Sequence, residues 1–164
     1  MKEKKRTNME HPDALNQVAE FHRTFQHPIE PEPAIPSPER CRLRVNLLEE
    51  EVKELRRAIQ DQDLTEIADA LCDIQYVLSG AILEFGLGRQ FKALFDEVHR
   101  SNMSKTCKTR EEAEATMRYY REERGFDSYV RQVDGHYLVF RRSDDKTLKS
   151  VNYSPADLRS ILSS

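Results

Sequence analysis

The segment between Thr65 and Gly88 constrains this chain more than any other, because it contains no lysine or arginine. Apolar residues occupy most of its helical circumference when successive residues are placed about 100° apart. A helix that is apolar nearly all round is usually buried by its neighbours. We therefore expect a helical core that encloses this segment. Its charged residues are all acidic and fall within an arc of about 60°, and they are Glu66, Asp69, Asp73 and Glu84.

The segment before it, residues 39–61, predicts a second long helix with a different division of its surface. One apolar stripe about 80° wide is expected to face the core, and it consists of Val45, Leu48, Val52, Leu55 and Ile59. Basic and polar side chains share the opposite, water-facing side, with Arg44 as the exception. Glu51 and Glu54 lie in a third sector of the helix surface, between the apolar stripe and the water-facing side. Glu50 lies at the edge of this sector.

The remaining patterns predict a mainly α-helical chain with one late hairpin. Five prolines between Pro28 and Pro38 predict an extended linker or a loop wrapped over the surface. Asp134-Gly135 predicts the hairpin turn between Tyr129 and Arg142. We expect a flexible tail over 1–11, a helical core over 12–105, and an appendage of helix, hairpin and tail over 106–164. The further helices are predicted over 13–27, 89–100, 109–124 and 155–162.

Composition excludes several classes of protein. No apolar run approaches the ~20 residues that span a bilayer, and the polar start lacks the apolar stretch of a secretory signal. Three cysteines, an odd number, favour reduced thiols. A net charge of −3 offers no basic field for a nucleic acid polymer. We expect a soluble cytoplasmic protein without a membrane partner.

The acids on the two long helices are more informative together than apart. Taken alone, the cluster at 49–54 is more simply a solvated helix face. A solvated face normally mixes charges of both signs, however, and the second helix has no base. If the two acidic sectors face each other, carboxylates converge in an apolar interior, which is costly unless a cation is present. Carboxylates are ligands for Mg²⁺, or for Mn²⁺ in its place.

Magnesium held by carboxylates commonly serves polyphosphate chemistry. Glu50, beside the cluster, is the candidate base that activates a water molecule. The chain has only five glycines and no Walker motif, so we do not expect a glycine-rich loop whose backbone binds phosphates. The phosphates must then be bound by side chains. Asn102 and Lys105, three residues apart, are suited to hold them, although a lysine at a helix end equally often only complements the helix dipole.

The acid motifs resemble a known superfamily. Leu47-Leu48-Glu49-Glu50-Glu51-Val52-Lys53-Glu54-Leu55, followed by Glu66-Ile67-Ala68-Asp69-Ala70-Leu71-Cys72-Asp73, is similar to the EExxE … ExxD signature of the all-α nucleoside triphosphate (NTP) pyrophosphohydrolases. Residues 21–25 and 98–105 further resemble the stand-alone MazG-like branch called phosphoribosyl-ATP pyrophosphohydrolase-like. The resemblance spans about residues 14–105.

The resemblance implies a MazG-like bundle of four or five helices, assembled as a homodimer or a dimer of dimers. It implies Mg²⁺-dependent cleavage of an NTP between the α and β phosphates. Glu50 would act on the attacking water, and Asn102 and Lys105 would bind the phosphate chain. The implied metal ligands are Glu51, Glu54, Glu66 and Asp69, with Asp73 as a further, outer partner.

Two aromatic residues of the first helix are weaker candidates. By the same resemblance, His22 and Phe25 would contact the nucleoside. The alternative is that Phe25 belongs to the core and His22 is a buried histidine with its hydrogen bonds satisfied. After Lys105 the chain departs from the compact relatives, because nearly forty residues intervene before a familiar tail at 144–155.

Three functional hypotheses remain open. The first is an NTP pyrophosphohydrolase that removes non-standard or deoxy nucleotides from the nucleotide pool. The second is hydrolysis of phosphoribosyl-ATP in histidine synthesis. The third is a helical oligomerisation module that binds a metal ion without catalysis.

Overall fold

A computed structural model describes residues 9–163 and divides the chain into two compact units. The first unit ends at Phe91 and the second begins at Lys92. Part of the predicted tail, residues 1–8, lies outside the described residues. No helix within residues 9–163 combines the length and the apolar character needed to cross a bilayer.

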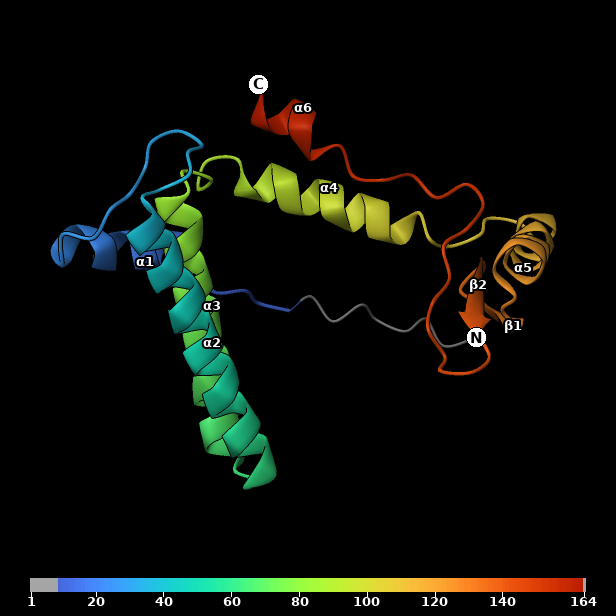
Figure 1. The fold of residues 1–164 in the computed structure, drawn as a ribbon, viewed down its shortest axis with the longest axis horizontal. Coiled ribbons are helices and arrows are strands. Elements are labelled where there is room, and N and C mark those ends of the chain that lie inside the picture. The colour runs from blue at the N-terminus through green and yellow to red at the C-terminus, as the bar shows by residue number, and fades with distance from the viewer. Residues whose placement is uncertain (1–8, 164) are drawn as a thin grey trace. The chain divides into compact units, whose positions relative to one another are not determined.

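The first unit is built on a long helical hairpin (Figure 1). Helix α2 (Pro38–Gln60) packs along α3 (Leu64–Glu84), and α1 (Ala14–Thr24) packs on α3. The Ser37 hydroxyl accepts from the backbone N–H of Arg40, which caps α2. Asp63 begins α3, because its carboxylate accepts from the N–H groups of Thr65 and Glu66. Helix α2 confirms the predicted span 39–61 to within one residue at each end, whereas α1 ends three residues before the predicted end at residue 27.

The apolar stripe of α2 is only partly covered in this unit: Leu48 and Leu55 are half-buried, but the other three residues are exposed, contrary to the prediction. Val45, Val52 and Ile59 are 54%, 46% and 56% exposed. The side of α2 that packs inward instead carries Arg44 and Ala58, both buried. Hydrophobic periodicity identifies a stripe that is expected to be buried. It does not tell whether the stripe is buried by the same chain or by another molecule.

Helix α3 is likewise less enclosed than its composition predicts. Its buried residues concentrate near its C-terminal end, where it meets α1 and the linker. Leu64, Leu71 and Leu78 are 77%, 52% and 38% exposed. The expectation of a helix buried nearly all round is therefore wrong for the single chain.

The proline-rich linker crosses the end of α3. The N–H of Glu30 donates to the Leu83 carbonyl at 3.0 Å, and that of Ala34 donates to the Phe85 carbonyl at 3.1 Å. Gly86, with φ +68°, lies so close to this linker that a Cβ there would be 1.8 Å from the Glu32 carbonyl oxygen. The linker is thus held against the end of α3, which matches the predicted loop wrapped over the surface.

The second unit contains α4 (Phe91–Met103), α5 (Arg110–Arg124), β1 (Ser128–Val133), β2 (His136–Arg141) and α6 (Leu158–Leu162). The two strands pair antiparallel, and Asp134 and Gly135 make the turn with φ of 48° and 80°. Helix α5 packs on the hairpin. The buried core of the second unit comprises Cys107, Ala113, Val139 and Leu148. The predicted fold class, mainly α with a small C-terminal helix and hairpin, is confirmed.

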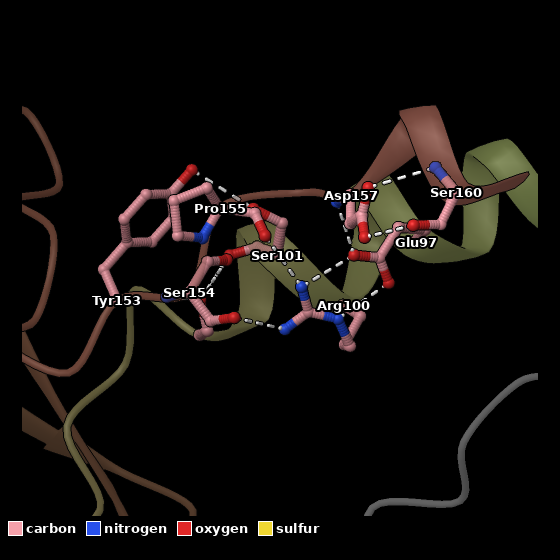
Figure 2. A network of polar contacts seen from close by, with 9 residues as sticks. Glu97, Arg100, Ser101, Tyr153, Ser154, Pro155, Asp157 and Ser160 are labelled. Carbon is pink, nitrogen blue, oxygen red and sulfur yellow. Dashed lines mark hydrogen bonds and ion pairs between the residues drawn. The ribbon is translucent and has the colours of Figure 1, made fainter. Parts of the chain in front are cut away.

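A polar clamp fastens the C-terminal tail to α4 (Figure 2). The Arg100 guanidinium donates to the Glu97 carboxylate at 2.8 Å, and to the Ser154 hydroxyl and the Pro155 carbonyl at 3.1 and 3.0 Å. Glu97 also accepts from the Asp157 N–H at 2.9 Å. The Arg100 hydrogen bond lowers the pKa of Glu97 to about 2. Arg100 therefore positions the tail.

Candidate active site

The acidic sectors of α2 and α3 meet near the loop that joins the two helices. A cavity of about 240 Å³ lies there, and three of the predicted metal ligands, Glu54, Glu66 and Asp69, line it. Two further carboxylates, Asp61 and Asp63, come from the connecting loop. The hairpin geometry thus brings acids from both helices to one place, as the helical spacing predicts.

Glu51 lies on the same face of α2 and is half-buried. Its Oε2 atom is shielded from solvent and has no hydrogen-bond partner among the described residues. Burial raises the pKa of Glu51, and the neighbouring charges of Asp73, Glu54 and Glu50 raise it further. Within residues 9–163, this carboxylate forms no ion pair with a basic side chain.

Hard oxygen donors with an unpartnered buried oxygen among them are the chemistry that a divalent cation fits. Within residues 9–163 no three Asp, Glu, His or Cys side chains are placed to hold an ion as they stand. Glu54, Glu66 and Asp69 are exposed, while Asp73 is half-buried. The predicted dry, apolar surroundings of the acids are therefore not found in the single chain.

Glu84 does not belong with Glu66, Asp69 and Asp73, with which its spacing on the helix had grouped it. Its side chain is 1% exposed and forms ion pairs with Arg40 and Arg44 of α2. Burial alone would raise the pKa of Glu84, but the two guanidinium groups outweigh burial and lower it. The sequence singled out Arg44 as an exception on its helix but did not indicate Arg40.

His22 is buried beside this ion-pair network. One ring nitrogen, Nδ1, lies 2.8 Å from the Pro28 carbonyl, and Nε2 lies 3.4 Å from Nη2 of Arg44. Burial lowers the pKa of His22, and Arg44 adds to the effect. Gly80 allows this approach, because a Cβ there would lie 2.7 Å from the Arg44 guanidinium. These contacts match the alternative of a buried histidine with satisfied nitrogens, and a nucleoside contact stays a prediction.

Phe25 belongs to an exposed aromatic group. It is 61% exposed, and its ring centroid lies 4.4 Å from that of Phe21. Phe21 also meets Tyr76 edge-on at 5.6 Å and stacks on His27 at 5.8 Å. Phe25 is thus not a core residue. The sequence did not indicate that Phe21 would join Phe25 to His27 and Tyr76, because the contact of Phe21 with Tyr76 joins α1 to α3.

Asn102 and Lys105 lie in the second unit. The Lys105 ammonium donates to the Asn102 side-chain oxygen at 2.7 Å, so the two side chains share one side as their spacing predicts. Their phosphate-binding role stays a prediction, as does the role of Glu50, which is exposed beside Glu51 on α2.

The helical hairpin and its paired acid motifs are those of the all-α NTP pyrophosphohydrolases. A family model described as phosphoribosyl-ATP pyrophosphohydrolase matches residues 18–102. The chain therefore belongs to the phosphoribosyl-ATP pyrophosphohydrolase family, within the MazG-like superfamily. This membership supports a pyrophosphohydrolase type of function.

A viral protein is similar over nearly the whole chain. It is called "Uncharacterized protein L479", from Acanthamoeba polyphaga mimivirus, and is 25% identical over 246 aligned positions. The alignment covers 95% of this chain and 98% of the viral protein. The similarity therefore extends beyond the family segment, which ends at residue 102, into the rest of the second unit.

Proposed function

We propose that this protein is a Mg²⁺-dependent NTP pyrophosphohydrolase that cleaves the bond between the α and β phosphates. The observation that carries the proposal is that acids of α2 and α3 lie close together. Glu54, Glu66 and Asp69 line one cavity, and Glu51, whose buried oxygen has no partner within the described residues, lies near enough to Asp69 and Asp73 to feel their charge. Membership of a pyrophosphohydrolase family supports the reaction type. The products would be a nucleoside monophosphate and pyrophosphate, consistent with removal of unwanted nucleotides.

The metal would be held by carboxylates of the helical hairpin. Glu51 and Glu54 of α2 and Glu66 and Asp69 of α3 are the proposed ligands, with Asp73 as an outer partner. The exposed members must change rotamer to converge, which their lack of packing permits. Bound Mg²⁺, or Mn²⁺ in its place, would neutralise the phosphate oxygens and polarise the phosphorus for attack.

The remaining roles fall to residues other than the metal ligands. Glu50 would accept a proton from the attacking water, because it adjoins the cluster without being needed as a ligand. Lys105 and Asn102 would bind the phosphate chain through an ammonium and an amide. Phe25 would stack on the base of the nucleotide. His22 would support the nucleoside-binding part of the site from beneath, through its contacts with Pro28 and Arg44.

A second copy of the chain would complete the bundle. On α2, Val45, Val52 and Ile59 recur every seven residues and are exposed, and so on α3 are Leu64, Leu71 and Leu78. Rows with this spacing on two helices are typical of helix packing in a bundle. A homodimer would cover both rows and remove water from around the acids. A dimer of dimers would use the same contact.

The proposal is tested by identifying products from a panel of nucleotides. Full-length protein is incubated with common and modified NTPs and dNTPs, and with phosphoribosyl-ATP, in Mg²⁺ and in EDTA. We expect monophosphate and pyrophosphate in Mg²⁺ alone, with a nucleoside triphosphate as the best substrate. Preferential turnover of phosphoribosyl-ATP would replace the proposed substrate, and metal binding without turnover of any compound would contradict catalysis.

A further inference from the structure

The second unit contains a larger cavity than the one at the acids. Its volume is about 690 Å³, and residues from α5, from the end of β2 and from the following tail line it. A volume of this size lies in the range that holds a small molecule. The lining contains no aspartate or glutamate and five basic residues, which are Lys105, Arg124, Arg141, Lys146 and Lys149.

Most of these basic groups lack an acidic partner. Arg141 pairs with Asp144, with 2.8 Å between Nε and Oδ1. Arg124 and Lys146 have no carboxylate within 4.0 Å in the part of the chain that the structure describes. The Lys149 ammonium lies 4.4 Å from the centre of the Tyr153 ring. Lys146 lies near enough to Asp144 for its charge to help lower the pKa of that carboxyl. The cavity still carries an excess of positive charge, to which Lys105, with an amide as its hydrogen-bond partner, contributes. A polyanion is the ligand that would relieve the mutual repulsion of these basic groups.

Aromatic rings provide a flat surface in the same cavity. Tyr119, Tyr120, Phe126 and Tyr153 all contribute to its lining. Tyr120 stacks on Phe126 with 6.2 Å between ring centroids, and its hydroxyl accepts from the Lys149 N–H at 3.1 Å. These contacts fix its orientation. Tyr119 is 41% exposed and meets Tyr120 edge-on at 5.2 Å, which leaves ring surface open to a ligand.

We propose that this cavity binds a nucleoside polyphosphate without a metal ion. The basic side chains would bind the phosphate chain, since ammonium and guanidinium groups form charge-assisted hydrogen bonds with phosphate oxygens. The base would stack on Tyr119, an interaction that every base can make. The side chains that distinguish this site, among them Arg124, Lys146 and Tyr119, come from α5 and the tail, whereas the proposed catalytic acids lie on α2 and α3. Lys105 is common to both, because the proposed function also places it on the phosphate chain of the substrate.

Isothermal titration of the full-length protein in EDTA tests this site, because chelation prevents metal-dependent binding at the acids. The probes are an ATP analogue with a methylene group between its α and β phosphates, inorganic tripolyphosphate, adenosine, and a single-stranded oligonucleotide of eight residues. The variants are Arg124→Ala, Lys146→Ala and Tyr119→Ala. Arg118→Ala is the matched control, because Arg118 is exposed on α5 and outside the lining.

We expect the ATP analogue to bind more tightly than tripolyphosphate or adenosine. Loss of either charge should weaken binding about tenfold, and raising the salt concentration should weaken it further. Tyr119→Ala should weaken binding of the ATP analogue but not binding of tripolyphosphate. Arg118→Ala should leave the binding of both probes unchanged.

Three results would overturn the proposal. One is that no phosphate-containing probe binds in EDTA. Another is that tripolyphosphate binds as tightly as the ATP analogue, which would make the site one for a bare phosphate chain. The third is much tighter binding of the oligonucleotide, which would indicate a nucleic acid partner. None of these results bears on hydrolysis in Mg²⁺, so the proposed function stands or falls separately.

Discussion

Arg44 of α2 and Glu84 of α3 form an ion pair inside the first unit, where their side chains are 8% and 1% exposed. Arg40 joins the same carboxylate from one turn earlier on α2. The pair lies where the two helices meet α1, through the contact of Arg44 with His22. It therefore fixes how the helices that carry the proposed ligands pack together.

Removing the positive partner should destabilise the fold strongly. Arg44→Met leaves the buried Glu84 carboxylate with Arg40 alone, and we expect a loss of about 3 kcal/mol in the free energy of unfolding. Arg42→Met is the matched control, because Arg42 pairs with Glu39 on the exposed face at 3.4 Å and should change stability by less than about 0.5 kcal/mol. Urea denaturation measures both, and equal losses would contradict the role given to the buried pair.

Glu51→Gln should stabilise the metal-free protein at pH 7. The pKa of Glu51 is raised in the fold, so the folded state holds its proton more firmly than the unfolded chain. Stability from this group therefore falls as pH rises from about 4.5 through the raised pKa. Removing the charge should add roughly 0.5–1 kcal/mol at pH 7.

The gain from Glu51→Gln should largely disappear in acid, because the wild-type carboxyl is then mostly protonated in both states. Denaturation of both proteins in EDTA at pH 4 and pH 7 separates this effect from other titrations. A gain of the same size at both values would show that charge is not its cause.

The sequence predicted local structure well because local structure depends on neighbours in the chain. The hairpin turn at Asp134-Gly135, for example, follows from two residues that tolerate positive φ. Contacts between distant residues were harder to foresee. Arg44 and Glu84 are 40 residues apart, so nothing in the sequence indicated that they would pair. The spacing of Glu84 on α3 therefore grouped it with the proposed metal ligands, whereas its charge is neutralised by Arg40 and Arg44 of α2.

The candidate site was predictable to the same extent. Helical spacing correctly placed Glu54, Glu66 and Asp69 around one cavity. It did not foresee that they would be exposed in the single chain, because the width of an apolar stripe does not tell whether its cover is another segment or another molecule. Arg100, in a motif similar to the family's, binds the tail through Ser154 and Pro155, which no periodicity indicates.

Gly86 and Gly125 provide a matched test of how the linker is held. Both have positive φ, of 68° and 64°, but a Cβ at Gly125 would have nothing within 4 Å. Gly125→Ala should therefore cost only the conformational penalty of about 1 kcal/mol. Gly86→Ala adds a collision with Glu32 and should cost at least about 2 kcal/mol. Thermal unfolding compares the two, and an equal cost would mean that the linker moves aside freely.

Val52→Asp should separate the proposed dimer. Val52 lies in the middle of the exposed apolar row on α2, and a carboxylate there would be buried without a partner in a four-helix bundle. Lys53→Asp makes a larger change of charge on the neighbouring exposed position and should leave assembly intact. Sedimentation equilibrium should give twice or four times the chain mass of 19.2 kDa for the wild type, and the monomer mass for Val52→Asp. A monomeric wild type would refute the dimer.

The most direct test of the acidic centre is the rate of pyrophosphate release by two neighbouring glutamate variants. Glu54→Gln removes a proposed ligand that lines the cavity, whereas Glu49→Gln removes an exposed carboxylate five residues away on the same helix. At saturating nucleotide and Mg²⁺, we predict that Glu54→Gln lowers kcat at least about 100-fold. Glu49→Gln should stay within about twofold of the wild type. Full activity in folded Glu54→Gln protein would contradict a catalytic metal site between α2 and α3.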